Sequence, residues 1–276
     1  MSPVRGRQKA ACRYTVFQVS FPLVANNLRE SFRVVAASRA VGEVRELHGA
    51  SIASAGATFQ MFNAAFLAQP VSTEPELVQR ILLPSVHFQS RGLEWAYWVC
   101  EDWMESRIRK RSRKVFEQHG LHLSTELPGM MADRLLPPVK PLPHLDVRRV
   151  RNGSTRDAFI DIGSVCFHVP IDWFREVFDS ESVWEDFAAY VGYFNGLPVS
   201  TTAIVHGGGA VGIYNVATTP LEQRRGFGEA TMRHAIAEAR LTHPFEPLVL
   251  QSTPVGLSLY QRMGFKTIAR VAVYSS

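Results

Sequence analysis

The sequence has little cysteine and no long apolar run. Three cysteines occur in 276 residues, at positions 12, 100 and 166. Their odd number and wide spacing exclude a disulfide framework and match no metal-binding pattern. No apolar run approaches the roughly 20 residues that a membrane-spanning helix needs. We therefore expect no metal, no contact with a membrane and a reducing, cytoplasmic location.

The N-terminus also has a poor pattern for a secretory signal. Its first residues are basic, but the apolar stretch over residues 14–24 is interrupted by Gln18, Ser20 and Pro22. We interpret residues 1–13 as a basic arm and the stretch after them as a strand. The rest of the composition, 46% hydrophobic and 20% charged, is that of a globular protein. A net charge of +5 suits an anionic ligand and is only a weak sign of nucleic acid.

Two common phosphate-binding motifs, GxGxxG and GxxxxGK[ST], do not occur between residues 211 and 240. A different pattern occupies residues 211–240. A strand-like run ends at Thr219-Pro220, and an amphipathic helix follows, with Met232, Ala235, Ile236 and Ala239 on one apolar stripe. The glycines at 226 and 228 lie between strand and helix, where unpaired main-chain N–H groups and the helix dipole favour an anion. The pattern predicts a binding loop for a pyrophosphate.

The segment Gln223-Arg224-Arg225-Gly226-Phe227-Gly228 resembles the coenzyme A loop of the GNAT acetyltransferases. Further along the chain, the segment from Leu259 to Phe265 resembles the closing motif of that family, in which a tyrosine lies near the coenzyme sulfur. Upstream, Asn195-Gly196 predicts a hairpin turn before the strand at residue 211. The resemblance covers residues 145–274 and implies an α/β fold, a mixed sheet flanked by helices.

The resemblance also implies a reaction, the transfer of an acetyl group from acetyl-CoA to an amine in a ternary complex. Tyr260 is the expected proton donor to the departing thiolate. The residues expected to bind the coenzyme are Asn215, Val216, Ala217, Thr218, Gln223, Arg224, Arg225, Gly226, Phe227, Gly228, Glu229 and Thr253. The family often has asparagine near Thr253, which puts this last contact in doubt.

The base and the amine acceptor stay open at this point. Tyr214, His206, His168, Glu185 and water are all candidates for the base. Aromatic residues at helical spacing either form core or line the acceptor pocket, as in the family; they are Trp173, Phe174, Phe178, Trp184 and Phe187. The acceptor is a small molecule or a peptide, and a homodimer is left open.

The first half of the chain echoes the second. Phe62-Asn63-Ala64 corresponds to Tyr214-Asn215-Val216, and the segment 115–121 corresponds to 259–265. We therefore predict two tandem GNAT-like domains, over residues 14–130 and 145–276, each with its own mostly antiparallel sheet. A proline-rich linker over 131–144 joins them.

The first copy is interpreted as degenerate and non-catalytic. It has no glycine between Gly56 and Gly92, and Thr73 with Glu76 forms a capping box that fills a helix N-terminus. Phe116 stands in the place of Tyr260.

The basic run 107–114 is interpreted as a solvated helix face, and we expect no nucleic acid. Two alternatives remain, a coenzyme-binding regulatory module without turnover and a nucleic-acid-associated acyltransferase.

Overall fold

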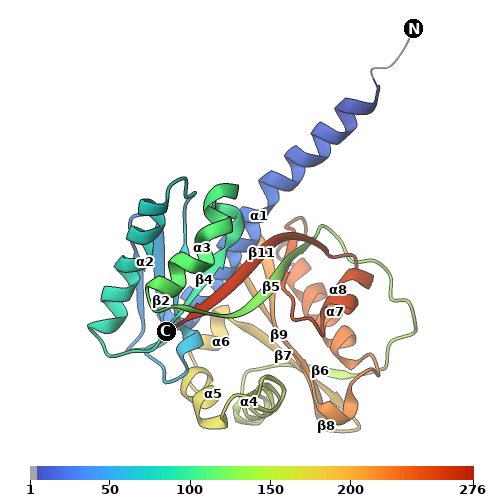
Figure 1. Ribbon diagram of the computed structural model, residues 1–276. Helices are drawn as coiled ribbons and strands as arrows, with labels where there is room; N and C mark the ends of the chain where they lie inside the picture. The colour runs from blue at the N-terminus through green and yellow to red at the C-terminus, as the bar shows by residue number, and fades with distance from the viewer. Residues whose placement is uncertain (1–4) are drawn as a thin grey trace.

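The protein is seen in a computed structural model that describes the main chain from residue 5 to 276 and the side chains from residue 20 onward (Figure 1). Its centre is one mixed sheet of eleven strands. The strands are β1 (Glu43–Glu46), β2 (Ala50–Ser54), β3 (Asn63–Leu67), β4 (Ala96–Cys100), β5 (His122–Ala132), β6 (Asp146–Arg149), β7 (Ala188–Phe194), β8 (Leu197–Gly207), β9 (Ala210–Thr218), β10 (Leu248–Gln251) and β11 (Lys266–Ser275).

The α-helices are α1 (Arg5–Ala37), α2 (Glu74–Gln89), α3 (Ser106–Gln118), α4 (Gly153–Phe167), α5 (Ile171–Phe178), α6 (Val183–Asp186), α7 (Phe227–Arg240) and α8 (Leu257–Arg262). Three short 3-10 helices are η1 (Gln60–Phe62), η2 (Glu101–Trp103) and η3 (Pro220–Glu222). The mixed α/β class is as predicted.

The sheet runs in the order β1-β2-β3-β4-β11-β5-β10-β9-β8-β7-β6. Each half contributes one parallel pair, β3 with β4 and β9 with β10. The last strand of each half pairs inside the other half, because β11 lies beside β4 and β5 lies beside β10. Figure 1 shows β5 and β11 side by side at the centre. The two separate sheets expected from the sequence are therefore replaced by one continuous sheet.

The helices cover both faces of this sheet. In β8, Ala203 and Val205 pack in the cluster of α4 and α5, whereas Ile204 packs in the cluster of α7 and α8. In β3, Ala64 lies in the cluster of α1 and Ala65 in that of α2 and α3. Since successive side chains in a strand point to opposite faces, α1, α4 and α5 share one face. The helices α2, α3, α7 and α8 share the other.

Helix α1 corrects the prediction for the N-terminal stretch. The strand expected over residues 14–24 is wrong, since the main chain is helical from Arg5 to Ala37, and the proposed domain start at residue 14 falls inside this helix. Residues 1–4 of the predicted arm lie outside the described residues. Burial of Val24, Leu28 and Val35 holds the helix to the sheet.

Asn27 fixes α1 to the second half of the chain. It is fully buried, and its side-chain amide donates hydrogen bonds to the carbonyl groups of Val205, Gly207 and Ala210 at 2.9 to 3.1 Å. The Tyr214 hydroxyl donates to Asn27 Oδ1 at 2.6 Å. The Asn27 side chain thus provides hydrogen-bond donors to carbonyl groups at the turn between β8 and β9.

The predicted linker is tied to the second half. Strand β5 extends to Ala132, two residues into the predicted linker, and the irregular segment follows. Leu136 donates its main-chain N–H to Met263 at 2.9 Å and accepts from Arg233 at 2.7 Å. Figure 1 shows the segment passing outside α7 and α8.

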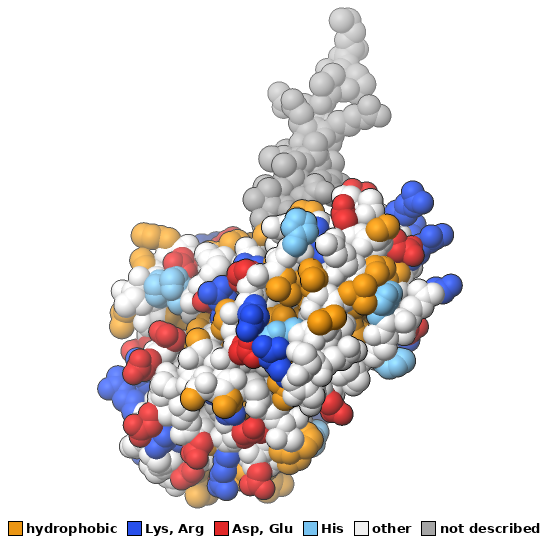
Figure 2. All heavy atoms as spheres, turned by 90° about the vertical axis from the view of Figure 1, so that its left-hand side faces the viewer, with side chains coloured by type: hydrophobic (Ala, Val, Ile, Leu, Met, Phe, Trp, Pro, Cys, Tyr) orange, Lys and Arg blue, Asp and Glu red, His pale blue; other side chains and the backbone are white. Residues whose placement is uncertain are grey.

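The surface of the first half is partly basic and partly apolar. The basic residues of α3 are exposed, as predicted, and Ile108 and Val115 face the core. Figure 2 shows apolar side chains on the side of the molecule where α2 lies, and Leu82, Leu83 and Val86 of that helix are exposed. Among the described residues, no helix has the length and hydropathy needed to cross a membrane.

Candidate active site

Strands β9 and β10 separate shortly after they begin to pair. Their parallel pairing consists of Val211 with Leu248 and Gly212 with Val249. On the other edge of β9, the register with β8 shifts between Tyr214 and Ala217, which is a bulge. Asn215 lies in this bulge with a φ of 48°, a conformation that asparagine tolerates better than most residues. From residue 213 onward the inner edge of β9 therefore has no strand partner.

The N-terminus of α7 lies at the end of β9 and offers free main-chain donors. The N–H groups from Gln223 to Glu229 have no acceptor among the described residues. The first helical bond joins the Ala230 N–H to the Gly226 carbonyl at 2.9 Å. Gly226 is the N-cap residue, and no side chain caps the helix. A helix start without a cap attracts an anion through these donors and the helix dipole.

The two glycines of this loop have different roles. Gly226 has a φ of 86°, which strains any residue with a Cβ atom. Gly228 has ordinary helical geometry, and a Cβ there would meet only Thr218 Oγ1, at 2.8 Å. The absence of this carbon lets the helix start approach the end of β9 closely.

The charged side chains of the loop are not all free. Arg225 pairs with Glu222, and its guanidinium lies over the rings of Phe194 and Phe227 at 5.1 and 4.9 Å. Glu229 pairs with Arg233 at 2.8 Å. Arg224 is exposed and has no ion pair among the described residues. Of the two predicted arginines, Arg224 is therefore the one available to an incoming phosphate.

Other predicted coenzyme contacts lie around this opening. Gln223 donates its side-chain amide to the Thr218 carbonyl at 3.3 Å, and the Cys166 thiol donates to the same carbonyl at 3.3 Å. Thr253 Oγ1 accepts from the Gly256 N–H at 3.4 Å and so supports the turn into α8. Phe227 is buried and anchors the helix start.

Tyr260 lies where the strands have separated. Its helix, α8, covers one face of the sheet. Tyr260 nevertheless lines a cavity that is also lined by residues of α1, α4 and α5, which cover the opposite face. The gap between β9 and β10 makes this possible. Burial raises the pKa of the Tyr260 hydroxyl to about 12, so it stays protonated at physiological pH. Gly256 leaves room for this ring, because a Cβ there would lie 2.7 Å from it.

This cavity, which we call the aromatic cavity, has a volume of about 350 Å³. The first half of the chain supplies Phe32, Phe59, Phe62 and Trp98, and the second half supplies Phe167, Phe174, Phe178, Phe187, Tyr214 and Tyr260. Rings from both halves touch, since Phe62 meets Phe178 edge-on at 5.6 Å. Among the residues predicted for an acceptor pocket, Trp173 and Trp184 do not line it.

No aspartate, glutamate or histidine lines the aromatic cavity among the described residues. Of the four residues considered as the base, only Tyr214 lies there, and burial raises its pKa well above the ordinary range. His206 pairs with Glu246 away from the cavity, and Glu185 lines a different hollow. His168 is an exposed C-cap residue of α4. The geometry thus places no base beside Tyr260.

The equivalent region of the first half is closed. Strands β3 and β4 pair over three of their five residues, and β2 pairs with β3 without a register shift. Thr73 Oγ1 accepts from the Glu76 N–H at 3.3 Å, and the Glu76 carboxylate accepts from the Ser72 N–H at 2.9 Å. The predicted cap is thus confirmed. Phe116 is fully buried and stacks on Tyr274.

No family model and no curated protein matches the chain. The structure is similar to a GCN5-related N-acetyltransferase from Kribbella flavida, with a TM-score of 0.68 at 17% identity, over 90% of this chain and 93% of that one. It is also similar to a functionally unknown conserved protein from Staphylococcus epidermidis, with a TM-score of 0.61 at 11% identity, over 86% and 94% of the two chains.

A GCN5-related N-acetyltransferase from Sphaerobacter thermophilus gives a TM-score of 0.51 at 14% identity, over 83% of this chain and 76% of that one. The chain has the GCN5-related N-acetyltransferase fold. This GNAT fold includes both halves of the chain, because the match to the Kribbella protein spans nearly all of it.

The residues that the sequence did not predict belong mainly to the first half. Phe32, Phe62 and Trp98 line the cavity of the GNAT fold together with Tyr260, although more than 150 residues separate them along the chain. No local pattern marks such a contact. Asn27 gives a weak signal, since it is a polar residue within the apolar stripe of α1.

Proposed function

We propose that the protein is an acetyl-CoA-dependent N-acetyltransferase. The observation that carries this proposal is the uncapped start of α7, whose free N–H groups lie at the mouth of the gap between β9 and β10. Donors in this arrangement suit a diphosphate. The expected coenzyme contacts are the main-chain groups from residue 223 to 229, with Arg224 supplying a positive charge.

The pantetheine arm of the coenzyme is expected along the free inner edge of β9. Residues Asn215, Val216, Ala217 and Thr218 form this edge beyond the last pairing with β10, and Thr253 lies across the gap. A main-chain donor here would stabilise the negative charge that develops on the thioester oxygen, a contribution of about 3 kcal/mol in enzymes where it has been measured.

The amine acceptor is expected to react beside Tyr260. The amine nitrogen attacks the thioester carbonyl carbon, a C–N bond forms and the C–S bond breaks. The thiolate takes the Tyr260 hydroxyl proton, and the resulting phenolate takes the proton that the amine nitrogen loses. Protons therefore balance without a separate base, provided that the amine enters uncharged.

The first half is proposed to be a copy of the same unit that does not bind coenzyme. Its parallel pair lies in the equivalent place of the sheet, and the corresponding segments fall on elements of the same kind. The Thr73 and Glu76 cap occupies the helix start that would otherwise receive a diphosphate.

The test is an assay of free thiol release from acetyl-CoA with a panel of primary amines, together with coenzyme binding by calorimetry. Amine-dependent thiol release supports the enzyme. Binding without release by any amine favours a regulatory coenzyme-binding module, a reading that the missing base also suits. Absence of binding contradicts both.

A further inference from the structure

The aromatic cavity carries an inference about the acceptor, which rests on the function proposed above. We propose that the acceptor is an apolar primary amine that binds uncharged. A polycation and a strongly polar amine are excluded by this proposal. It follows from the charge and the shape of the cavity.

The lack of charged side chains in the cavity determines the protonation state in which the amine binds. Tyr214 and Tyr260 are the titratable residues that line it, and the pKa values of both are raised by burial. An ammonium ion in this place would lose its water and gain no carboxylate partner. Desolvation of this kind disfavours the charged form of an amine. The cavity therefore selects the neutral amine, which is also the reactive form.

The aromatic walls of the cavity determine which carbon skeleton of the amine fits. The ring centres of Phe32 and Trp98 are 5.0 Å apart, and so are those of Phe174 and Phe178. Flat rings from both halves of the chain therefore line the cavity. Its volume of about 350 Å³ lies at the lower end of the range for small-molecule pockets. A single aromatic ring on a short aliphatic arm suits this space better than a sugar or a long polyamine.

The experiment compares two amines with the full chain under saturating acetyl-CoA, 2-phenylethylamine and putrescine. We expect kcat/KM to be at least 100-fold higher for 2-phenylethylamine than for putrescine. Turnover of putrescine at the same or a higher kcat/KM would overturn the inference and leave the proposed function standing. Absence of coenzyme binding would overturn both.

Two variants locate the selection in the cavity. Phe62→Ala should lower kcat/KM for 2-phenylethylamine at least tenfold and leave the affinity for acetyl-CoA unchanged. Met61→Asp places a carboxylate at a half-buried lining position, and it should raise kcat/KM for putrescine relative to 2-phenylethylamine. Leu221→Asp is the matched control, because Leu221 is exposed and lies outside the cavity. Unchanged preference in both cavity variants, with the fold intact by circular dichroism, would contradict the inference.

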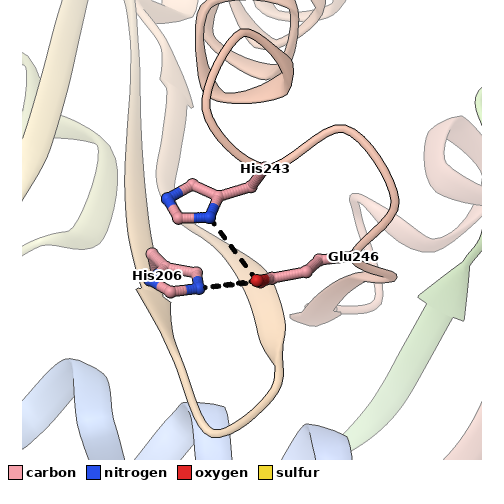
Figure 3. Close-up of side chains that lie close together, drawn as sticks. All are labelled: His206, His243 and Glu246. Atoms are coloured by element: carbon pink, nitrogen blue, oxygen red, sulfur yellow. Dashed lines mark hydrogen bonds and ion pairs between the residues drawn. The ribbon is translucent and has the colours of Figure 1, made fainter.

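A second inference rests on a separate cluster, His206, His243 and Glu246. Figure 3 shows both imidazole rings directing a nitrogen at the Glu246 carboxylate. His206 Nε2 lies 2.9 Å from Glu246 Oε1 and 2.8 Å from Oε2, and His243 Nδ1 lies 3.4 Å from Oε1. The three ligand atoms lie within 4.8 Å of one another. We propose that the cluster binds a divalent transition metal of the zinc class.

The chemistry and the support of the cluster suit such an ion. Two imidazole nitrogens and one carboxylate form a common zinc ligand set, in which ligand atoms lie roughly 3 to 3.5 Å apart. The loop that carries His243 and Glu246 is held in place, because Arg240 donates to the carbonyl groups of His243, Pro244 and Glu246. No sequence motif marks the set, since His206 comes from β8 and the other two from the loop before β10.

The position of this cluster gives the ion a role in the fold. His206 pairs with Val211 in the sheet, and Pro247 accepts the Val211 N–H at 2.9 Å, just before β9 and β10 separate. A bound ion would therefore link β8 to the loop before β10, next to the place where β9 and β10 are still paired.

The test titrates the metal-free full chain with Zn²⁺ in competition with a chromophoric chelator. We expect one ion per chain and a rise in Tm, both lost in His243→Ala. His234→Ala is the control, because His234 is an exposed histidine of α7 outside the cluster. Equal Zn²⁺ affinity in His243→Ala, or no binding by the unaltered chain, would overturn the inference.

Discussion

Replacing Tyr260 by phenylalanine separates chemistry from binding. The ring is 8% exposed, and burial alone raises the pKa of its hydroxyl to about 12, with no charged or hydrogen-bonding partner contributing. Phenylalanine therefore fits the same space and breaks no hydrogen bond. We expect the free energy of unfolding to change by less than about 1 kcal/mol.

The effect on turnover is expected to be much larger. A positioned general acid contributes a factor of about 100 or more, so kcat should fall about 100-fold, equivalent to about 2.7 kcal/mol in the activation barrier. The dissociation constant for acetyl-CoA should stay within about twofold, because the diphosphate donors lie on α7. The hydroxyl donates only while protonated, so its contribution should persist from neutral pH up to the region of its pKa, about 12.

The assay measures kcat, coenzyme affinity and Tm for Tyr260→Phe and for Tyr190→Phe. Tyr190 is a suitable control, because it is buried in the same cluster and has a pKa raised by burial but does not line the aromatic cavity. A Tyr260→Phe variant with kcat within twofold of the unaltered protein would refute the role of Tyr260 as proton donor.

Three other variants test the remaining parts of the site and the fold. Gly228→Asp puts a carboxylate among the diphosphate donors and should weaken acetyl-CoA binding at least 100-fold by calorimetry, whereas Gly153→Asp, at the start of α4 with open space around it, should not. Asn27→Ala removes the side-chain donor from two buried carbonyl groups and a partly buried one, and it should cost about 3 to 5 kcal/mol in urea unfolding. The pKa of Glu43 is lowered from 4.5 to about 2, chiefly by the hydrogen bond from Arg91, so its contribution is complete above pH 4.5 and is lost as the pH falls towards 2. The stability difference between Glu43→Gln and the unaltered chain should follow the same course.

Local features of the second half could be predicted from the sequence. The turn at Asn195-Gly196 has positive φ at both residues, and Gly264 ends α8 with a φ of 104°, as the residue types require. The uncapped start of α7 also follows from its glycines, since they supply no side chain to cap it. These features depend on residues that are adjacent along the chain, so a local sequence pattern can predict them.

Features that depend on distant contacts could not be predicted. The stretch 14–24 has strand-like composition, but packing of Val24 and Leu28 against the sheet makes it part of a helix. The exchange of β5 and β11 joins strands that no local signal pairs. The aromatic cavity likewise combines rings from both halves of the chain. Of the aromatic residues that the sequence suggested for an acceptor pocket, Phe174, Phe178 and Phe187 line it.

The central claim is that one half of the chain offers free main-chain donors to a diphosphate and the other half does not. Calorimetric titration of the full chain with acetyl-CoA tests it directly. We expect one site per chain, with binding lost in Gly228→Asp and unchanged in Gly153→Asp. Two equivalent sites per chain, or no binding at all, would contradict it.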